Sequence, residues 1–289
     1  MTGTLRTLRA EWYRLVRSRA VLGAALFVAA VAALRVFAAR MSELAGYAAE
    51  VQRALSRGTP APPAPPVGNA WAPFADGWLA GLTVSTLLLI ILAARSLAGD
   101  RESGLLRVAR TRSVSRAGLV AGRALLGLLL VVTAMLLTGV ASLAAAAWWF
   151  DFLPVQEGSY VLVSTPELRL ELLRAVAATV PPLMATWCFG LWISSIARGG
   201  TGAVSGALAL YLGFDLFKAV LGDRQYLAFA AFNPSFVDHS CLKEFAGIAR
   251  GFSDAGYSST LYAQNLWLPW PQAVLLLLLA GWITSRRAL

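Results

Sequence analysis

Long apolar runs alternate with short charged segments along the whole chain. A helix needs about 20 mostly apolar residues to cross a bilayer, and six runs approach or exceed this length. The runs cover residues 20–39, 77–94, 118–149, 172–196, 201–221 and 267–284. We therefore expect an all-α polytopic membrane protein, with six transmembrane helices in a single domain over residues 1–289.

The first 19 residues predict an amphipathic helix on the membrane surface. Leu5, Leu8, Trp12 and Leu15 recur at helical spacing, and arginines occupy much of the remaining surface. Such a helix lies in the interface plane, with its aromatic side chain at the depth of the lipid headgroups.

Composition agrees with a membrane protein and excludes several other classes. The mean hydropathy is +0.64 and 58% of the residues are hydrophobic, which is too apolar for a soluble domain of this length. The net charge of +10 is distributed over the ends of the apolar runs instead of one patch, so we expect no nucleic-acid partner. Cys188 and Cys241 suggest no disulfide framework.

The charges between the apolar runs predict the orientation in the membrane. On one side, the net charge is +4 before the first run, +4 over residues 95–116, +1 at Arg198 and +2 at the C-terminus. On the other side it is 0 over residues 40–76, −3 over 151–171 and −1 over 222–266. Short loops rich in Lys and Arg stay in the cytoplasm. We therefore expect a multi-pass protein of the cell (inner) membrane with both termini cytoplasmic and an extracellular segment over 222–266.

A charged island, residues 97–116, connects the second and third runs. Asp100 is expected to cap the start of a short helix, with Glu102 in its first turn, where the helix dipole favours an acid. Gly104 would let another backbone or side chain approach closely, and Leu105 follows it. From the residues alone, the island is either a loop that sets the topology or a short cytoplasmic element held between two membrane helices.

The island resembles the cytoplasmic coupling segment of the ABC type-2 (ABC-2) exporter permeases. The matching residues are Asp100-Arg101-Glu102-Ser103-Gly104-Leu105-Leu106, followed by Val114-Ser115-Arg116. Leu105 stands where Thr is common in that family, and Ser113 where Pro is common. The layout of the whole chain is also similar to that family, whose members have an N-terminal elbow helix, six spans and an outer helical segment before the last span.

The resemblance implies a permease subunit of an ABC exporter, which couples ATP hydrolysis by a separate ATPase subunit to transport across the membrane. It implies that a second permease copy completes the pathway, that ATP and Mg²⁺ bind the partner ATPase, and that this chain has no cofactor of its own. The expected contacts with the ATPase are Asp100, Arg101, Glu102, Gly104 and Leu105. A mostly apolar pathway suits lipids, drugs or hydrophobic peptides as the substrate.

The sequence contains no catalytic motif. A P-loop reads Gly-x-x-x-x-Gly-Lys-Ser/Thr, and neither Lys218 nor Lys243 stands in such a context, so we expect that the chain is not an enzyme. One loop contains four residue types that bind metals, but a single histidine is a weak basis for a metal site, and we expect none. These residues are Asp238, His239, Cys241 and Glu244.

Two charged residues in the fifth run support a second hypothesis. Asp215 and Lys218 are three residues apart, so they share one helix face and could form an ion pair. Because an acid inside a membrane helix is a functional candidate, the alternative is a secondary transporter or membrane enzyme that uses this pair. A structural ion pair near the outer interface explains the two residues equally well.

Overall fold

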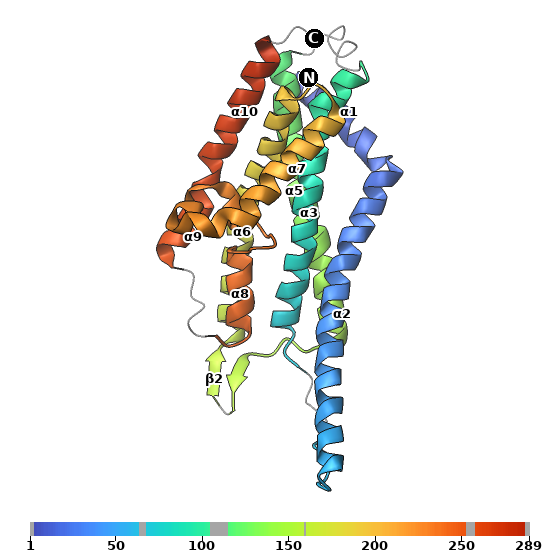
Figure 1. Ribbon diagram of the computed structural model, residues 1–289, viewed down its shortest axis with the longest axis vertical. Coiled ribbons are helices and arrows are strands. Elements are labelled where there is room, and N and C mark those ends of the chain that lie inside the picture. The colour runs from blue at the N-terminus through green and yellow to red at the C-terminus, as the bar shows by residue number, and fades with distance from the viewer. Residues whose placement is uncertain (1–2, 64–67, 105–114, 159, 253–257, 287–289) are drawn as a thin grey trace.

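The computed structural model describes residues 3–63, 68–104, 115–158, 160–252 and 258–286. Helices that are long and apolar enough to cross a membrane make up most of the fold, and they run alongside one another (Figure 1). They are α2 (Arg19–Ser56), α3 (Trp71–Glu102), α5 (Arg116–Trp149), α6 (Thr165–Ile196), α7 (Gly200–Phe217) and α10 (Pro269–Arg286). With six such helices in the described residues, the prediction of a six-helix polytopic membrane protein is confirmed.

Both termini lie at one end of the bundle, which we name the terminal end (Figure 1). The amphipathic helix α1 (Gly3–Val16) packs there against the first turns of α5. The opposite end, named the far end, carries the end of α2 and an antiparallel hairpin of β1 (Val155–Glu157) and β2 (Tyr160–Val163). The all-α prediction did not include this hairpin, which β-branched valines and the left-handed Gly158 (φ 62°) favour.

Between α7 and α10 the chain forms a series of short helices. These are the 3₁₀ segments η1 (Lys218–Leu227) and η2 (Phe229–Phe232), then α8 (Cys241–Ala249) and α9 (Ser259–Trp267). Gly222 interrupts η1 with a kink. Its φ of 53° is a conformation that residues with a side chain rarely adopt. The segment packs back onto the bundle, with α8 against α3 and α6 (Figure 1).

The bundle has two central helices, α3 and α6. More than half of the most apolar stretch of each is buried, whereas the share is 28% or less for the other four long helices. Two buried tryptophans attach the central helices to α5. Trp78 of α3 lies against Gly139 and donates to the carbonyl oxygen of Met135 (3.1 Å). Trp187 of α6 lies against Gly127 and donates to the carbonyl oxygen of Arg123 (3.0 Å).

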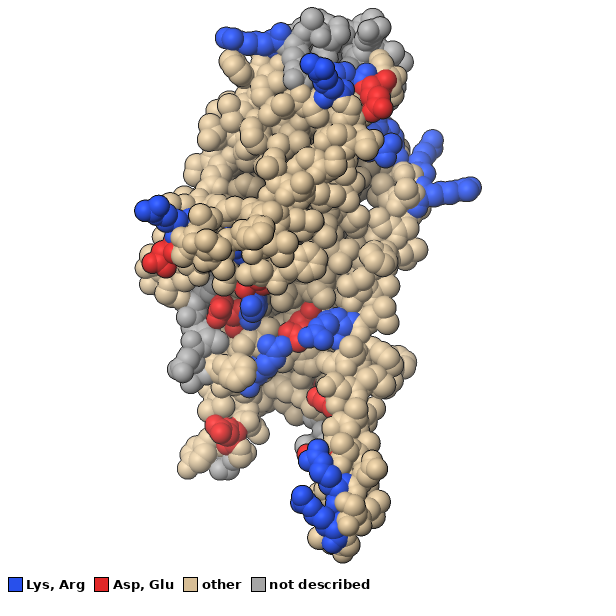
Figure 2. All heavy atoms as spheres, viewed as in Figure 1, with Lys and Arg blue, Asp and Glu red and all other residues tan. Residues whose placement is uncertain are grey.

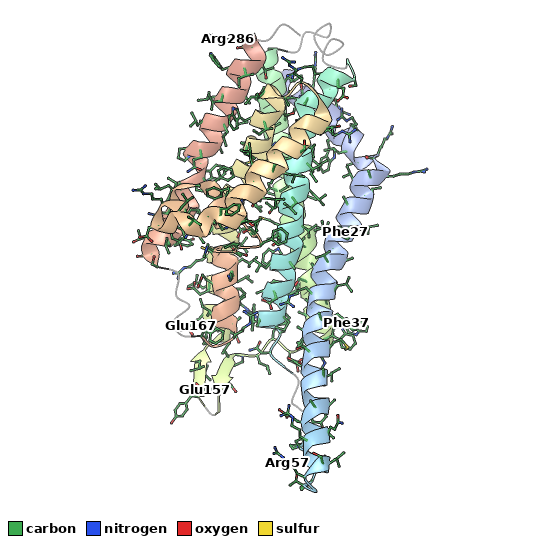
Figure 3. The ribbon with its side chains drawn as sticks, in the orientation of Figure 1. Phe27, Phe37, Arg57, Glu157, Glu167 and Arg286 are labelled. Atoms are coloured by element: carbon green, nitrogen blue, oxygen red, sulfur yellow. The ribbon has the colours of Figure 1, made fainter. Side chains whose placement is uncertain are left out.

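Exposed apolar faces and charged ends mark where a bilayer would surround the bundle. Charged side chains gather near the terminal end and again near mid-length, and much of the face between them is uncharged (Figure 2). Phe27 of α2 is 59% exposed and lies between Arg286 at the terminal end and Arg57 at the far end (Figure 3). The 38 residues of α2 span about 57 Å, more than the hydrocarbon core of a bilayer, so its far part extends beyond the membrane.

Candidate functional site

The charged island begins as the last turn of α3. Asp100, Arg101 and Glu102 continue this helix, and Ser103 is its C-cap. The prediction that Asp100 caps a new helix, with Glu102 in the first turn, is therefore wrong, because nothing between the second apolar run and Ser103 interrupts the helix. Gly104 follows with a φ of 74°, the left-handed conformation in which helices commonly end.

Asp100 lies at the centre of a charge network in which only Arg14 is largely exposed. Its side chain is 9% exposed, and its two oxygens accept hydrogen bonds from Arg14 of α1 (2.9 Å) and from Arg123 of α5. Arg123 is 1% exposed and also pairs with Glu11 of α1 (3.1 Å), which lies 3.7 Å from Arg14. These two acids and two arginines, named the terminal network, connect α1, α3 and α5.

Arg101 and Glu102 connect the same end of α3 to the turn between α6 and α7. Arg101 donates hydrogen bonds to the carbonyl oxygens of Ala197 (2.5 Å) and Ser195 (3.5 Å). Glu102 accepts a hydrogen bond from the backbone N–H of Gly200 (2.9 Å), the first residue of α7. Because the free N–H groups and the dipole at a helix start favour an acid, this contact stabilises the beginning of α7.

Four of the five predicted coupling residues therefore lie together at the terminal end, and Leu105 lies outside the described residues. Glu11, Arg14 and Arg123 were not expected from the sequence as members of this network. The available signals were a single acid in an arginine-rich helix and a single arginine near the start of an otherwise uncharged run. Neither signal identifies the partner of these charges.

The charged pair Asp215–Lys218, at the junction of α7 and η1, forms as predicted. Lys218 Nζ lies 2.8 Å from Asp215 Oδ1, and both side chains are at most 1% exposed. Lys218 also donates to Ser235 Oγ (3.2 Å), and Asp215 Oδ2 accepts a hydrogen bond from the backbone N–H of Phe236 (3.1 Å). The pair therefore fixes the chain that follows η2 against the end of α7.

Asp238 lies close to this pair and outside the long helices. It is 5% exposed, and its Oδ1 accepts a hydrogen bond from the Ser240 N–H (2.6 Å). Burial raises the pKa of the Asp238 carboxyl from 3.8 to about 6, although this hydrogen bond and the charges of Lys243 and Lys218 oppose the shift. Burial and the same two lysines lower the pKa of the neighbouring His239.

The loop considered as a metal site forms packing contacts in the structure. In the described parts of the chain, no group of three or more His, Cys, Asp and Glu side chains could hold a metal ion. Cys241 accepts a hydrogen bond from Asn265 of α9 (3.1 Å), and Glu244 lies in the first turn of α8, where burial raises the pKa of its carboxyl. The hydrogen bond between Cys241 and Asn265 therefore connects α8 to α9.

The fold and the terminal network define a polytopic membrane protein whose helix ends are joined by buried charges. The family model described as "ABC-2 family transporter protein" matches residues 6–235, which include the network and the pair in α7. The chain belongs to this family: it is a membrane permease of an ABC transporter, a transmembrane component that is not itself catalytic and that works with an ABC ATPase subunit. A comparison with curated proteins gives no match.

We expect Arg123→Met to destabilise the protein strongly, because Asp100 and Glu11 would remain buried with Arg14 as their only arginine in the network. Removing one member of a buried ion pair costs about 3–5 kcal/mol, whereas replacing both members by apolar residues costs far less. The double variant Arg123→Met/Asp100→Leu should therefore unfold at a higher temperature than Arg123→Met in the same detergent. Arg198→Met, at an exposed arginine of the same end, is the control and should unfold like wild type. Wild-type stability of Arg123→Met would contradict the network.

The raised pKa of Asp238 predicts a pH dependence of stability. Between pH 3.8 and about 6 the folded state holds a proton that the unfolded state has released, so the free energy of unfolding should fall as the pH rises. The full loss is about 3 kcal/mol above pH 6. Asp238→Asn cannot ionise, so its unfolding temperature should lack this fall, whereas Asp223→Asn, at an exposed acid of η1, should keep it. Identical pH profiles of Asp238→Asn and wild type would refute the assignment.

Proposed function

We propose that this chain is the membrane-spanning subunit of an ABC exporter of the cell (inner) membrane. ATP hydrolysis on a separate ATPase subunit drives the transport, and a second permease copy completes the pathway. The terminal end faces the cytoplasm in this proposal. Its support is the family match and the distribution of charge, because the described parts of all four basic segments lie at the terminal end.

The terminal network, together with the hydrogen bonds of Arg101 and Glu102, is the observation that supports the coupling role. Asp100, Arg101 and Glu102 connect a single helix end to α1, to α5 and to the turn before α7. Closely packed and hydrogen-bonded elements shift as units instead of deforming continuously. An ATPase that displaces the connection between α3 and α5 would therefore move these helices together.

The contacts inside the chain divide the predicted coupling residues into two groups. Asp100, Arg101 and Glu102 bond within the permease, so we propose that they position the coupling segment. Ser103 is exposed at the tip of α3 and Gly104 follows it, so this tip is the proposed contact with the ATPase. Leu105 remains a proposed contact on the resemblance alone, and ATP and Mg²⁺ belong to the partner.

The alternative of a secondary transporter has less support. An acid that couples ion movement to transport must reach water or exchange partners during the cycle. Asp215 is fully enclosed, and both of its oxygens have partners within the chain, Lys218 and the backbone of Phe236. We therefore propose a structural role for Asp215 and Lys218.

A bulky side chain at the tip of α3 should prevent the ATPase from binding without affecting the bundle. We expect wild-type protein purified from its native membrane to bring down an ATPase with a P-loop, identified by mass spectrometry. Ser103→Trp should lose most of this ATPase, because the exposed position faces the proposed partner. The purified permease alone should hydrolyse no ATP.

Ser56→Trp is the matched control for Ser103→Trp. Ser56 is also an exposed serine at the end of a long helix, but it lies at the far end, so this variant should retain the ATPase. Equal recovery of the ATPase with both variants would remove the tip of α3 from the interface. ATP turnover by the permease alone would contradict the proposal that ATP is hydrolysed on a separate subunit.

A further inference from the structure

A groove of about 830 Å³ opens at the terminal end between α3 and α7. Arg14 of α1 and the last turn of α3 border it. The two facing helices contribute most of its walls, through Ile91, Arg95 and Gly99 on α3 and Thr201, Val204 and Leu208 on α7. The volume of the groove is therefore comparable to that of sites that hold small organic ligands.

The lining of the groove changes from polar to apolar with depth. Helix α3 ends at the terminal end and α7 begins there, so Ser103 and Thr201 lie at the mouth. Ile91 precedes Ser103 by three turns, and Leu208 lies about 12 Å along α7 from its first residue, so the apolar residues lie deeper. The deep part lies between two helices that are long and apolar enough to cross a membrane. We therefore place the deep part beside the hydrocarbon and the mouth at the depth of the headgroups.

Arg95 is the charged residue of the groove lining that is available to bind a ligand. Asp100 and Arg14 bond to each other, and Glu102 accepts a hydrogen bond from the start of α7. Arg95 is exposed, and in the described parts of the chain it has no hydrogen bond or ion pair. Its side chain extends along α3 past Gly99, where its Nε would lie 3.9 Å from an added Cβ, so the guanidinium points toward the mouth.

A molecule that satisfies this lining has an anionic group and an apolar chain. Arg95 offers several N–H donors to a phosphate or carboxylate at headgroup depth, where arginine binds such groups in a forked geometry. Apart from the Ser205 hydroxyl, which donates to the carbonyl oxygen of Thr201 (3.1 Å), the wall below Arg95 is apolar. It would bury an acyl chain at a gain of about 0.8 kcal/mol per CH₂ group in transfer from water. A soluble anion would leave this wall in contact with water.

We propose that the groove binds an amphiphile with an anionic headgroup, drawn from the surrounding leaflet, and that this class of molecule is the cargo. The headgroup contacts Arg95, and the chain lies along Ile91, Val204 and Leu208. The term cargo rests on the proposed permease function, whereas occupancy of the groove does not.

The test uses the full chain in nanodiscs of phosphatidylcholine that contain a small fraction of phosphatidylglycerol with a photoreactive diazirine in its acyl chain. After irradiation, mass spectrometry maps the labelled residues. We expect labels to concentrate on the groove residues of α3 and α7. The same probe without its phosphate, as a neutral diacylglycerol, should label them at least about tenfold less, because the hydrogen bond between Arg95 and the charged group is lost. Inorganic phosphate should not displace the anionic probe.

Matched variants separate the two parts of the site. Arg95→Gln should reduce groove labelling by phosphatidylglycerol about tenfold, whereas Arg198→Gln, an exposed arginine outside the groove lining, should not. Leu208→Trp should fill the deep part and exclude the probe, whereas Leu210→Trp, which lies on the same helix outside the lining, should have no effect.

Several results would overturn the proposal. One is equal labelling of the groove in Arg95→Gln and wild type, and another is equal labelling by phosphatidylglycerol and by the neutral diacylglycerol. Displacement of the probe by inorganic phosphate would indicate a site for small anions instead. If Ser205→Cys formed a disulfide between two copies while the probe stayed out of the groove, the occupant would be a second permease copy. Because the assay needs no ATPase, these outcomes are independent of whether the ATPase co-purifies.

Discussion

Burial of one guanidinium determines how the terminal end of the bundle is built. Arg123 is almost inaccessible to water, and a buried charge is tolerated only with partners of opposite sign. Asp100 and Glu11 supply those partners from two other helices, and Arg14 balances the second acid. The position of α1 and the end of α3 are therefore coupled to α5 by an electrostatic requirement as well as by packing.

The bilayer accounts for how much of the fold could be predicted from the sequence. A helix that crosses hydrocarbon must be apolar over a fixed length, so composition alone identified the six spans. Outside the hydrocarbon that constraint disappears. The continuation of α2 to Ser56 and the hairpin next to Gly158 depend on local propensities and on packing at the far end, and neither leaves a comparable pattern in the sequence.

The sequence singled out the charged residues of this region, but it did not reveal most of their contacts. The charged island and the pair Asp215–Lys218 were recognisable because charges are rare in such a chain and the pair is local in sequence. The partners of Asp100 lie 86 and 23 residues away, and no spacing rule connects them. Asp100, Arg101 and Glu102 were expected to contact an ATPase, and in the structure they form bonds to distant segments of the permease itself.

The proposed coupling to an ATPase requires that the terminal end faces the cytoplasm, because only the cytoplasmic side provides ATP to a partner. Four exposed serines can each be changed to cysteine: Ser103 and Ser285 near the terminal end, and Ser56 and Ser258 in the segments expected outside. The two natural cysteines are buried. On intact cells, a membrane-impermeant maleimide should label Ser56→Cys and Ser258→Cys, and it should label Ser103→Cys and Ser285→Cys only after the membrane is opened. Labelling of Ser103→Cys on intact cells would contradict the account.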